Sequence, residues 1–156
     1  MRLRILALGT RMPAWVSEGY ADYARRLPRE WPLELVEIKP EGRSATRSLE
    51  QVLTLEAARV ESQCAENALR VVLDEKGQAW STQSLAQKLA SWDAAGRAAD
   101  FLIGSADGLA PSLKSSASAT WALSAGTLPH GLVRVILAEQ LYRAVSLLRG
   151  HPYHRA

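Results

Sequence analysis

The chain has 156 residues, of which 47% are hydrophobic and 22% are charged, and it carries a formal net charge of +3. A chain of this length buries roughly two thirds of the surface that its unfolded form exposes, so we expect one globular domain over residues 1–156. The composition excludes a disordered or collagen-like chain, and the mildly basic charge favours an anionic partner such as RNA.

The single cysteine, Cys64, excludes an internal disulfide and favours a reducing, cytoplasmic compartment. The apolar run near the N-terminus is about five residues long, shorter than the ~7–15 of a signal peptide. No apolar run approaches the ~18 residues of a membrane span. We therefore expect a cytoplasmic protein that does not enter the membrane.

Short apolar runs alternate with amphipathic segments along the chain. The runs predict strands at 3–8, 33–38, 70–75, 100–104 and 120–124. The segments between them have helical spacing: one lies between Pro13 and Pro28, one has a face formed by Leu49, Leu53, Ala57, Val60 and Cys64, and one runs from a Ser81 or Thr82 cap to Gly96. This alternation predicts an α/β fold with a mainly parallel sheet of five to six strands and helices on both faces.

The segment 39–48, "KPEGRSATRS", is polar and contains Arg43 and Arg47. We expect a mobile loop that reaches a phosphate backbone.

The last predicted helix, 131–149, has apolar residues on two sides. One broad face carries Leu137, Ala138, Leu141, Ala144, Val145 and Leu148, and the other side carries Leu132, Val135, Ile136 and Leu147. One sheet covers only one of these faces. Either the helix is unusually central or its second face meets another subunit, and we favour a homodimer.

The first candidate site is "FLIGSADGLAP", residues 101–111, where a strand runs into Gly104 and Gly108. An open α/β sheet places its ligands at the carboxyl ends of its strands, where backbone N–H groups are free. The spacing lacks the G-x-G-x-x-G of a dinucleotide site and the Gly-Lys-Ser/Thr of a phosphate-binding loop. A plain turn is the alternative.

The second candidate is the loop that opens "WALSAGTLPHGLVRV", after the predicted strand 120–124. Its small residues expose backbone N–H and C=O groups, which suits recognition of an adenine edge or an amino-acid head group. Pro129 limits the flexibility of this wall. His130 is either a base or, more commonly at a helix start, a hydrogen-bonding group.

The third candidate is the tail "GHPYHRA". His151 and His154 have metal-ligand spacing, but no Asp, Glu or Cys lies near enough in the sequence to complete a set, so we expect no metal. Tyr153 is suited to stacking on a base, and Arg149 and Arg155 to pairing with phosphates. The alternative is a disordered basic tail.

Together, "LIGSADGL", "LSAGTLPHGLVRVILAEQLYRA" and "HPYHR", with the opening "ALGTRMPAWVSEGYADYARRLP", resemble the RlmH family of SPOUT-class methyltransferases over essentially the whole chain. The resemblance implies a C-terminal trefoil knot, a homodimer and S-adenosylmethionine (SAM) bound in the knot. It implies methylation of N3 of a pseudouridine in a hairpin loop of 23S rRNA, on the assembled ribosome. The cofactor contacts that it implies are Leu73, Gly104, Leu123, Ser124, Ala125, Gly126, Thr127 and Leu128.

Two positions depart from this family. Ser105 follows Gly104 where the family usually has a second glycine, and a serine at positive φ would cost about 1 kcal/mol. Gly126 replaces a bulkier residue and is expected to loosen the pocket wall.

Methylation of a ring nitrogen needs alignment and removal of the N3 proton, but no covalent protein nucleophile. We expect Arg143 to hold the base together with Tyr153, His154 and Arg155, these three supplied by the neighbouring subunit. Candidate proton acceptors are His154, Glu139 and water near an arginine. A non-enzymatic ribosome-binding or assembly factor is the alternative function, and the missing G-x-G-x-x-G disfavours an oxidoreductase.

Overall fold

The computed structural model describes residues 1–155, without the side chains of His154 and Arg155. Five strands form one parallel sheet in the order β2-β1-β4-β3-β5. The strands are β1 (Leu3–Leu8), β2 (Leu33–Ile38), β3 (Ala68–Ala79), β4 (Ala98–Ile103) and β5 (Ala119–Ala122). The predicted parallel α/β sheet is confirmed at five strands.

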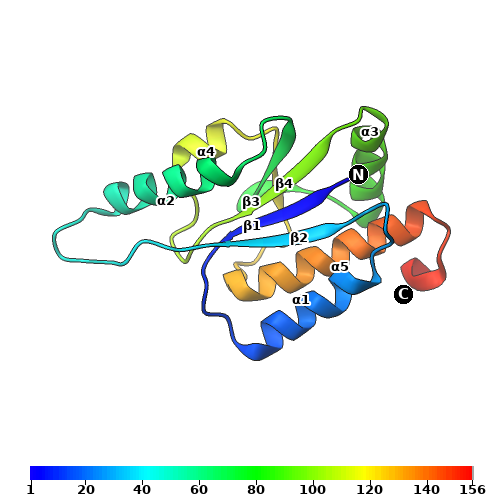
Figure 1. Cartoon of the computed structure of the whole chain (residues 1–156), viewed down its shortest axis with the longest axis horizontal. Helices are drawn as coiled ribbons and strands as arrows, with labels where there is room; N and C mark the ends of the chain where they lie inside the picture. The colour runs from blue at the N-terminus through cyan, green and yellow to red at the C-terminus, as the bar shows by residue number, and fades with distance from the viewer. Residues whose placement is uncertain (156) are drawn as a thin grey trace.

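Helices cover both faces of the sheet, as predicted. They are α1 (Ala14–Arg26), α2 (Leu49–Gln63), α3 (Thr82–Ala94), α4 (Pro111–Ser115), α5 (His130–Leu148) and the 3₁₀ helix η1 (Pro152–Arg155). Figure 1 shows α1 and α5 side by side on one side of the sheet and α2 and α4 on the other. The ends of the described chain lie toward the same side of this view.

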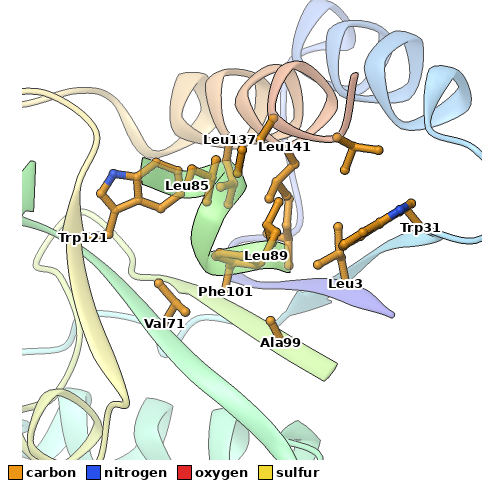
Figure 2. Packing of buried hydrophobic residues seen from close by; sticks show 14 of the residues in the cluster. Leu3, Trp31, Val71, Leu85, Leu89, Ala99, Phe101, Trp121, Leu137 and Leu141 are labelled. Carbon is orange, nitrogen blue, oxygen red and sulfur yellow. The ribbon is translucent and has the colours of Figure 1, made fainter. Parts of the chain in front are cut away.

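Two hydrophobic clusters correspond to these two layers. In the larger, Phe101 and Val71 of the sheet pack against Leu85 of α3 and Leu137 of α5 (Figure 2). In the smaller, strand residues such as Leu102 meet Val60 of α2 and residues of α4. Strands β1 and β4 therefore bury side chains on both faces, which explains their nearly continuous apolar sequences.

Strand β3 is longer than the prediction of 70–75 and extends to Ala79. Its register with β5 shifts between Leu73 and Gln78, so a polar stretch leaves the ladder and returns to it. Where the strand returns, a Cβ on Gly77 would lie 2.7 Å from the backbone of Thr120. Only glycine lets the backbones of β3 and β5 approach this closely.

The predicted inner face of α2 was partly wrong. Ala57 and Val60 are buried, but Leu49 is 50% exposed, and the carboxylate-bearing Glu56 is buried with 2% exposure. An apolar pattern locates a buried helix face only when every residue of that face is apolar. In α2 the buried face includes a glutamate, Glu56.

Helix α5 buries its broad face, including Leu137 and Leu141, against the sheet. Part of its second side is covered by α1, because a Cβ on Gly19 would lie 3.2 Å from the side chain of Val135. At the end of the helix the predicted broad face was wrong for Leu148, which is 38% exposed. The homodimer and the trefoil knot stay predictions, since strand order and packing within one chain test neither. Over residues 1–155, no helix is long and apolar enough to cross a membrane.

Candidate functional site

A pocket of about 360 Å³ opens at the carboxyl edge of the sheet. Most of its lining comes from three segments: the part of β3 near its register shift, the turn after β4, and the loop between β5 and α5. Single residues of α4, β5 and α5 complete it. The lining residues are Leu73, Asp74, Glu75, Lys76, Ser105, Ala106, Asp107, Gly108, Lys114, Trp121, Leu123, Ser124, Gly126, Thr127, Leu128 and Val133. These include six of the eight predicted cofactor contacts; Gly104 and Ala125 adjoin the lining without belonging to it.

The turn after β4 depends on two glycines. Gly108 has φ +79° and donates its backbone N–H to the carbonyl of Ser105 at 2.8 Å. A Cβ on Gly104 would lie 2.5 Å from the backbone carbonyl carbon of Gly108. Gly104 therefore supports the pocket from behind, by letting the turn fold back onto the strand end.

The strain expected at Ser105 does not occur. Over residues 1–155, every residue with positive φ is a glycine, so a serine fits at position 105 without left-handed backbone. Its hydroxyl donates to Glu56 Oε1 at 3.3 Å. The departure from two adjacent glycines thus adds a hydrogen bond rather than backbone strain.

The loop 123–128 forms the opposite wall. The Gly126 N–H donates to Ser124 Oγ at 3.0 Å, and the hydroxyl of Thr127 donates to the carboxylate of Glu75. A Cβ on Gly126 would meet only Ser124 Oγ, at 3.6 Å, so this position has room for a bulkier residue. The loop presents small side chains and backbone polar groups to the pocket, as expected from its sequence.

The pocket also contains charges that the sequence analysis missed. Lys114 Nζ lies 2.9 Å from Asp74 Oδ2, and the Lys76 N–H donates to Asp74 Oδ1 at 3.1 Å. Burial raises the pKa of Asp74, but these hydrogen bonds and the charges of both lysines outweigh it and lower that pKa. The available signal was the position of Asp74 directly after the apolar run "VVL", which is where β3 leaves its pairing with β5.

The tail packs on the middle of α5 in its own chain. Arg143 Nε donates to Glu139 Oε1 at 2.7 Å, and the Tyr153 hydroxyl donates to the same oxygen at 3.2 Å. The Arg143 guanidinium lies 4.9 Å from the centroid of the Tyr153 ring. Three predicted substrate-site residues are thus brought together: Glu139, Arg143 and Tyr153.

The protonation of this cluster follows from its contacts. Burial raises the pKa of Tyr153 to about 12, and a hydrogen bond with Tyr23 and the charge of Glu139 contribute. The hydrogen bond and charge of Glu139 also raise the pKa of Arg143. At neutral pH the phenol is therefore an uncharged donor beside a permanent cation.

The tail cluster and the pocket of one chain are separate. Val133 of α5 lines the pocket. Arg143 lies ten residues further along the same helix, which corresponds to roughly 15 Å between the two residues along the helix axis. None of Glu139, Arg143 or Tyr153 belongs to the lining. The side chains of His154 and Arg155, predicted for RNA contact and proton transfer, lie outside the described part of the chain.

Arg134 is a structural residue near the pocket that sequence reasoning missed. It is 1% exposed; its guanidinium donates to the Gly9 carbonyl at 2.8 Å and to Glu37 Oε2 at 2.7 Å. It ties the start of α5 to the ends of β1 and β2. His130 is the first residue of α5, whose N-cap is Pro129 without a side-chain hydrogen bond, and it does not line the pocket.

Comparison with known proteins identifies the family of the chain. A family model described as "Predicted SPOUT methyltransferase" matches residues 1–154. Proteins of Nitrosospira multiformis and Burkholderia mallei, each named "Ribosomal RNA large subunit methyltransferase H", are 51% identical over 156 residues, with 100% of both chains covered.

Solved structures share the fold at low sequence identity. A probable methylase family protein from Haemophilus influenzae aligns with a TM-score of 0.59 at 10% identity, covering 97% of this chain and 69% of that one. A probable methyltransferase from Bordetella pertussis aligns with a TM-score of 0.58 at 14% identity, covering 92% and 95%. These likenesses concern the fold alone.

Proposed function

Because the chain belongs to the SPOUT methyltransferase family, we propose that it is a SAM-dependent methyltransferase of large-subunit ribosomal RNA. The observation that carries the proposal is the pocket, which gathers Leu73 and most of the loop 123–128 at one edge of the sheet. The relatives named for this activity match over their full length. The proposed target is N3 of a pseudouridine in a 23S rRNA hairpin loop, on the assembled ribosome in the cytoplasm.

The pocket suits SAM in size and chemistry. Its volume of about 360 Å³ lies within the roughly 300–1,000 Å³ typical of small-molecule sites. Leu73, Leu123 and Leu128 offer apolar contact for an adenine ring, and backbone groups of the loop offer hydrogen bonds to its edge. The cofactor supplies an electrophilic methyl group on a sulfonium.

The protein contributes position and charge to the reaction. Arg143 is held by Glu139, so its guanidinium has a fixed orientation and stays charged, ready to stabilise an N3 that has lost its proton. The Tyr153 ring offers a stacking surface for the base. As a neutral phenol it does not accept the proton, which leaves Glu139, His154 and water as candidate acceptors.

The distance between pocket and tail favours a composite site. In one chain the tail lies well along α5 from the pocket, so substrate held by Tyr153 and Arg143 would not face that chain's own cofactor. In a homodimer, the tail of one chain could lie beside the pocket of the other, so that substrate and cofactor meet. We propose this arrangement, together with the trefoil knot that the family resemblance implies.

Two measurements test the function. Isothermal titration with SAM is expected to show micromolar binding to the purified protein. Ribosomes from a strain that lacks the protein are expected to gain one methyl group per 23S rRNA when incubated with protein and SAM, and mass mapping should place it on a pseudouridine. Ribosome binding without SAM binding or methyl transfer would instead identify a non-enzymatic assembly factor.

A further inference from the structure

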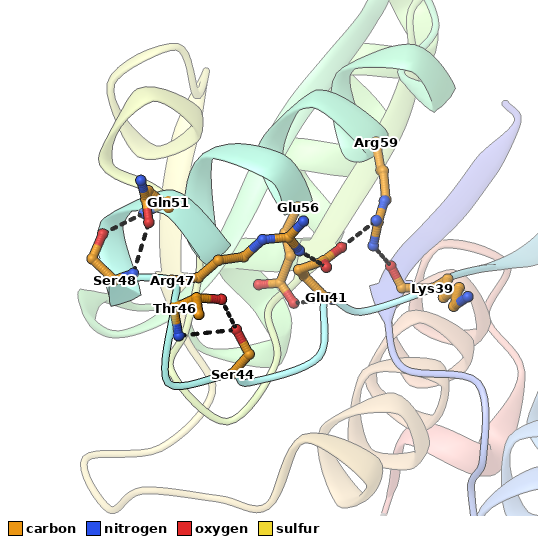
Figure 3. A network of polar contacts seen from close by, with 9 residues as sticks. All are labelled: Lys39, Glu41, Ser44, Thr46, Arg47, Ser48, Gln51, Glu56 and Arg59. Carbon is orange, nitrogen blue, oxygen red and sulfur yellow. Dashed lines mark hydrogen bonds and ion pairs between the residues drawn. The ribbon is translucent and has the colours of Figure 1, made fainter.

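A buried carboxylate lies directly behind the pocket. Glu56, on α2, is 2% exposed. Its Oε2 accepts the Glu41 backbone N–H at 3.1 Å, and its Oε1 accepts the Ser105 hydroxyl at 3.3 Å. One side chain thus connects the segment 39–48 to the turn after β4, and Figure 3 shows Glu56 directed toward Glu41.

The segment 39–48 makes side-chain contacts within itself and with α2 that the sequence alone did not predict, while its expected mobility stays a prediction. The Glu41 carboxylate pairs with Arg47 and Arg59, and Arg59 Nη1 donates to the Lys39 carbonyl at 2.9 Å (Figure 3). Arg43 pairs with Asp107 of the pocket turn. The turn is therefore connected to this segment at two positions, Ser105 and Asp107, both of which line the pocket.

We propose that Glu56 is a positioning residue for the cofactor pocket. A buried carboxylate that loses a hydrogen-bond donor is destabilised, so Glu56 favours the arrangement in which Ser105 and the Glu41 backbone both point at it. Because Ser105 is part of the pocket lining, the same arrangement fixes the wall that SAM contacts. The proposal rests on the proposed function, in which SAM occupies this pocket.

This role differs from a contribution to folding alone. A structural carboxylate would lower stability when removed but leave the SAM affinity of the folded protein unchanged. A positioning carboxylate acts through Ser105, so removing the hydroxyl must weaken SAM binding even though the carboxylate remains. Substituting both Glu56 and Ser105 must then weaken SAM binding little more than substituting one of them, because the two side chains act through the same hydrogen bond.

The test is isothermal titration of SAM into the wild-type chain, Ser105→Ala, Glu56→Gln and the double variant. The glutamine keeps the shape of the side chain but does not accept both hydrogen bonds. We expect the dissociation constant to rise about three- to tenfold in each single variant, the typical net effect of one hydrogen bond, and no further in the double variant. The KM for SAM should rise by the same factor, with the KM for ribosomes unchanged.

Glu61→Gln is the matched control, since it makes the same change on the same helix at a carboxylate that pairs with Arg70 outside the pocket. Its SAM affinity should equal that of the wild type. Should Glu56→Gln fail to fold, Ser105→Ala decides alone. Wild-type binding with an unchanged affinity in Ser105→Ala overturns the positioning role only, whereas a wild-type chain that does not bind SAM overturns the proposed function as well.

Discussion

Gly104 illustrates how a residue outside the pocket lining controls the pocket. A methyl group at this position would meet the Gly108 backbone at 2.5 Å, so Gly104→Ala must displace the turn. Overpacking of this kind typically costs about 1–3 kcal/mol, and we expect SAM affinity to fall roughly tenfold or more. Isothermal titration of the folded variant measures the effect.

Gly42→Ala is the control for that substitution. A Cβ there has nothing within 4 Å and the residue does not need positive φ, so both stability and SAM affinity should match the wild type. Equal SAM affinity in Gly104→Ala and Gly42→Ala would show that the turn does not shape the cofactor site.

Tyr20 is expected to make stability depend on alkaline pH. Burial, followed by the charge of Glu34, raises the pKa of Tyr20 to about 12, whereas an unfolded tyrosine titrates near pH 10. The folded chain keeps this proton to higher pH than the unfolded one, so the stabilisation is complete below about pH 10 and is lost as pH rises toward 12. Between pH 8 and pH 10.5, the free energy of unfolding measured in urea should fall less in Tyr20→Phe than in the wild type. Equal losses would contradict the burial of this phenol.

At the scale of elements, helix α5 is ended by a cap at Gly150 that does not involve Tyr153 to Ala156. Gly150 has φ +69°, its N–H donates to the Leu147 carbonyl at 3.2 Å, and the His151 N–H donates to the Ser146 carbonyl at 2.8 Å. This glycine-based cap completes the helix before η1 begins. We therefore expect deletion of Tyr153 to Ala156 to leave α5 and the pocket folded.

We expect that deletion to abolish methyl transfer while SAM affinity stays within about twofold, a difference below 0.5 kcal/mol. The reason is that Tyr153 and its neighbours contact the proposed substrate and not the cofactor. SAM titration and single-turnover methylation of ribosomes separate the two functions. A parallel loss of SAM binding would place the tail in the cofactor site instead.

Local pattern predicted the elements because strands buried on both faces, such as β1 and β4, are apolar runs and the helices have helical spacing. It did not predict the polar part of β3, since the return of Gln78 and Ala79 to β5 depends on a tertiary approach at Gly77. The loop after β5 was a candidate site because of its small residues, whereas Leu73 and the individual cofactor contacts within 123–128 came from family resemblance. Glu56, Lys114 and Arg134 were missed because their roles depend on partners distant in sequence, and no periodicity distinguishes them from solvated charges.

At the scale of the whole molecule, the separation of pocket and tail predicts that each active site needs two chains. A chain with Gly104→Ala would have an impaired pocket and an intact tail, and a chain lacking Tyr153 to Ala156 would have the reverse. The truncated homodimer should be inactive, and at SAM concentrations well below its dissociation constant the Gly104→Ala homodimer should keep at most about a tenth of the wild-type activity. A mixed dimer would contain one site with an intact pocket from the truncated chain and an intact tail from its partner.

Co-expression of the two variants with different affinity tags, followed by tandem purification, isolates the mixed dimer. We expect about half of the wild-type methylation per dimer, because one of two symmetric sites is restored. An untagged mixture with random pairing should give about a quarter. If each site were built from one chain, no pairing of these variants would restore activity, since every chain would carry its own defect; the mixed dimer therefore distinguishes a shared site from two independent ones, whichever group accepts the N3 proton.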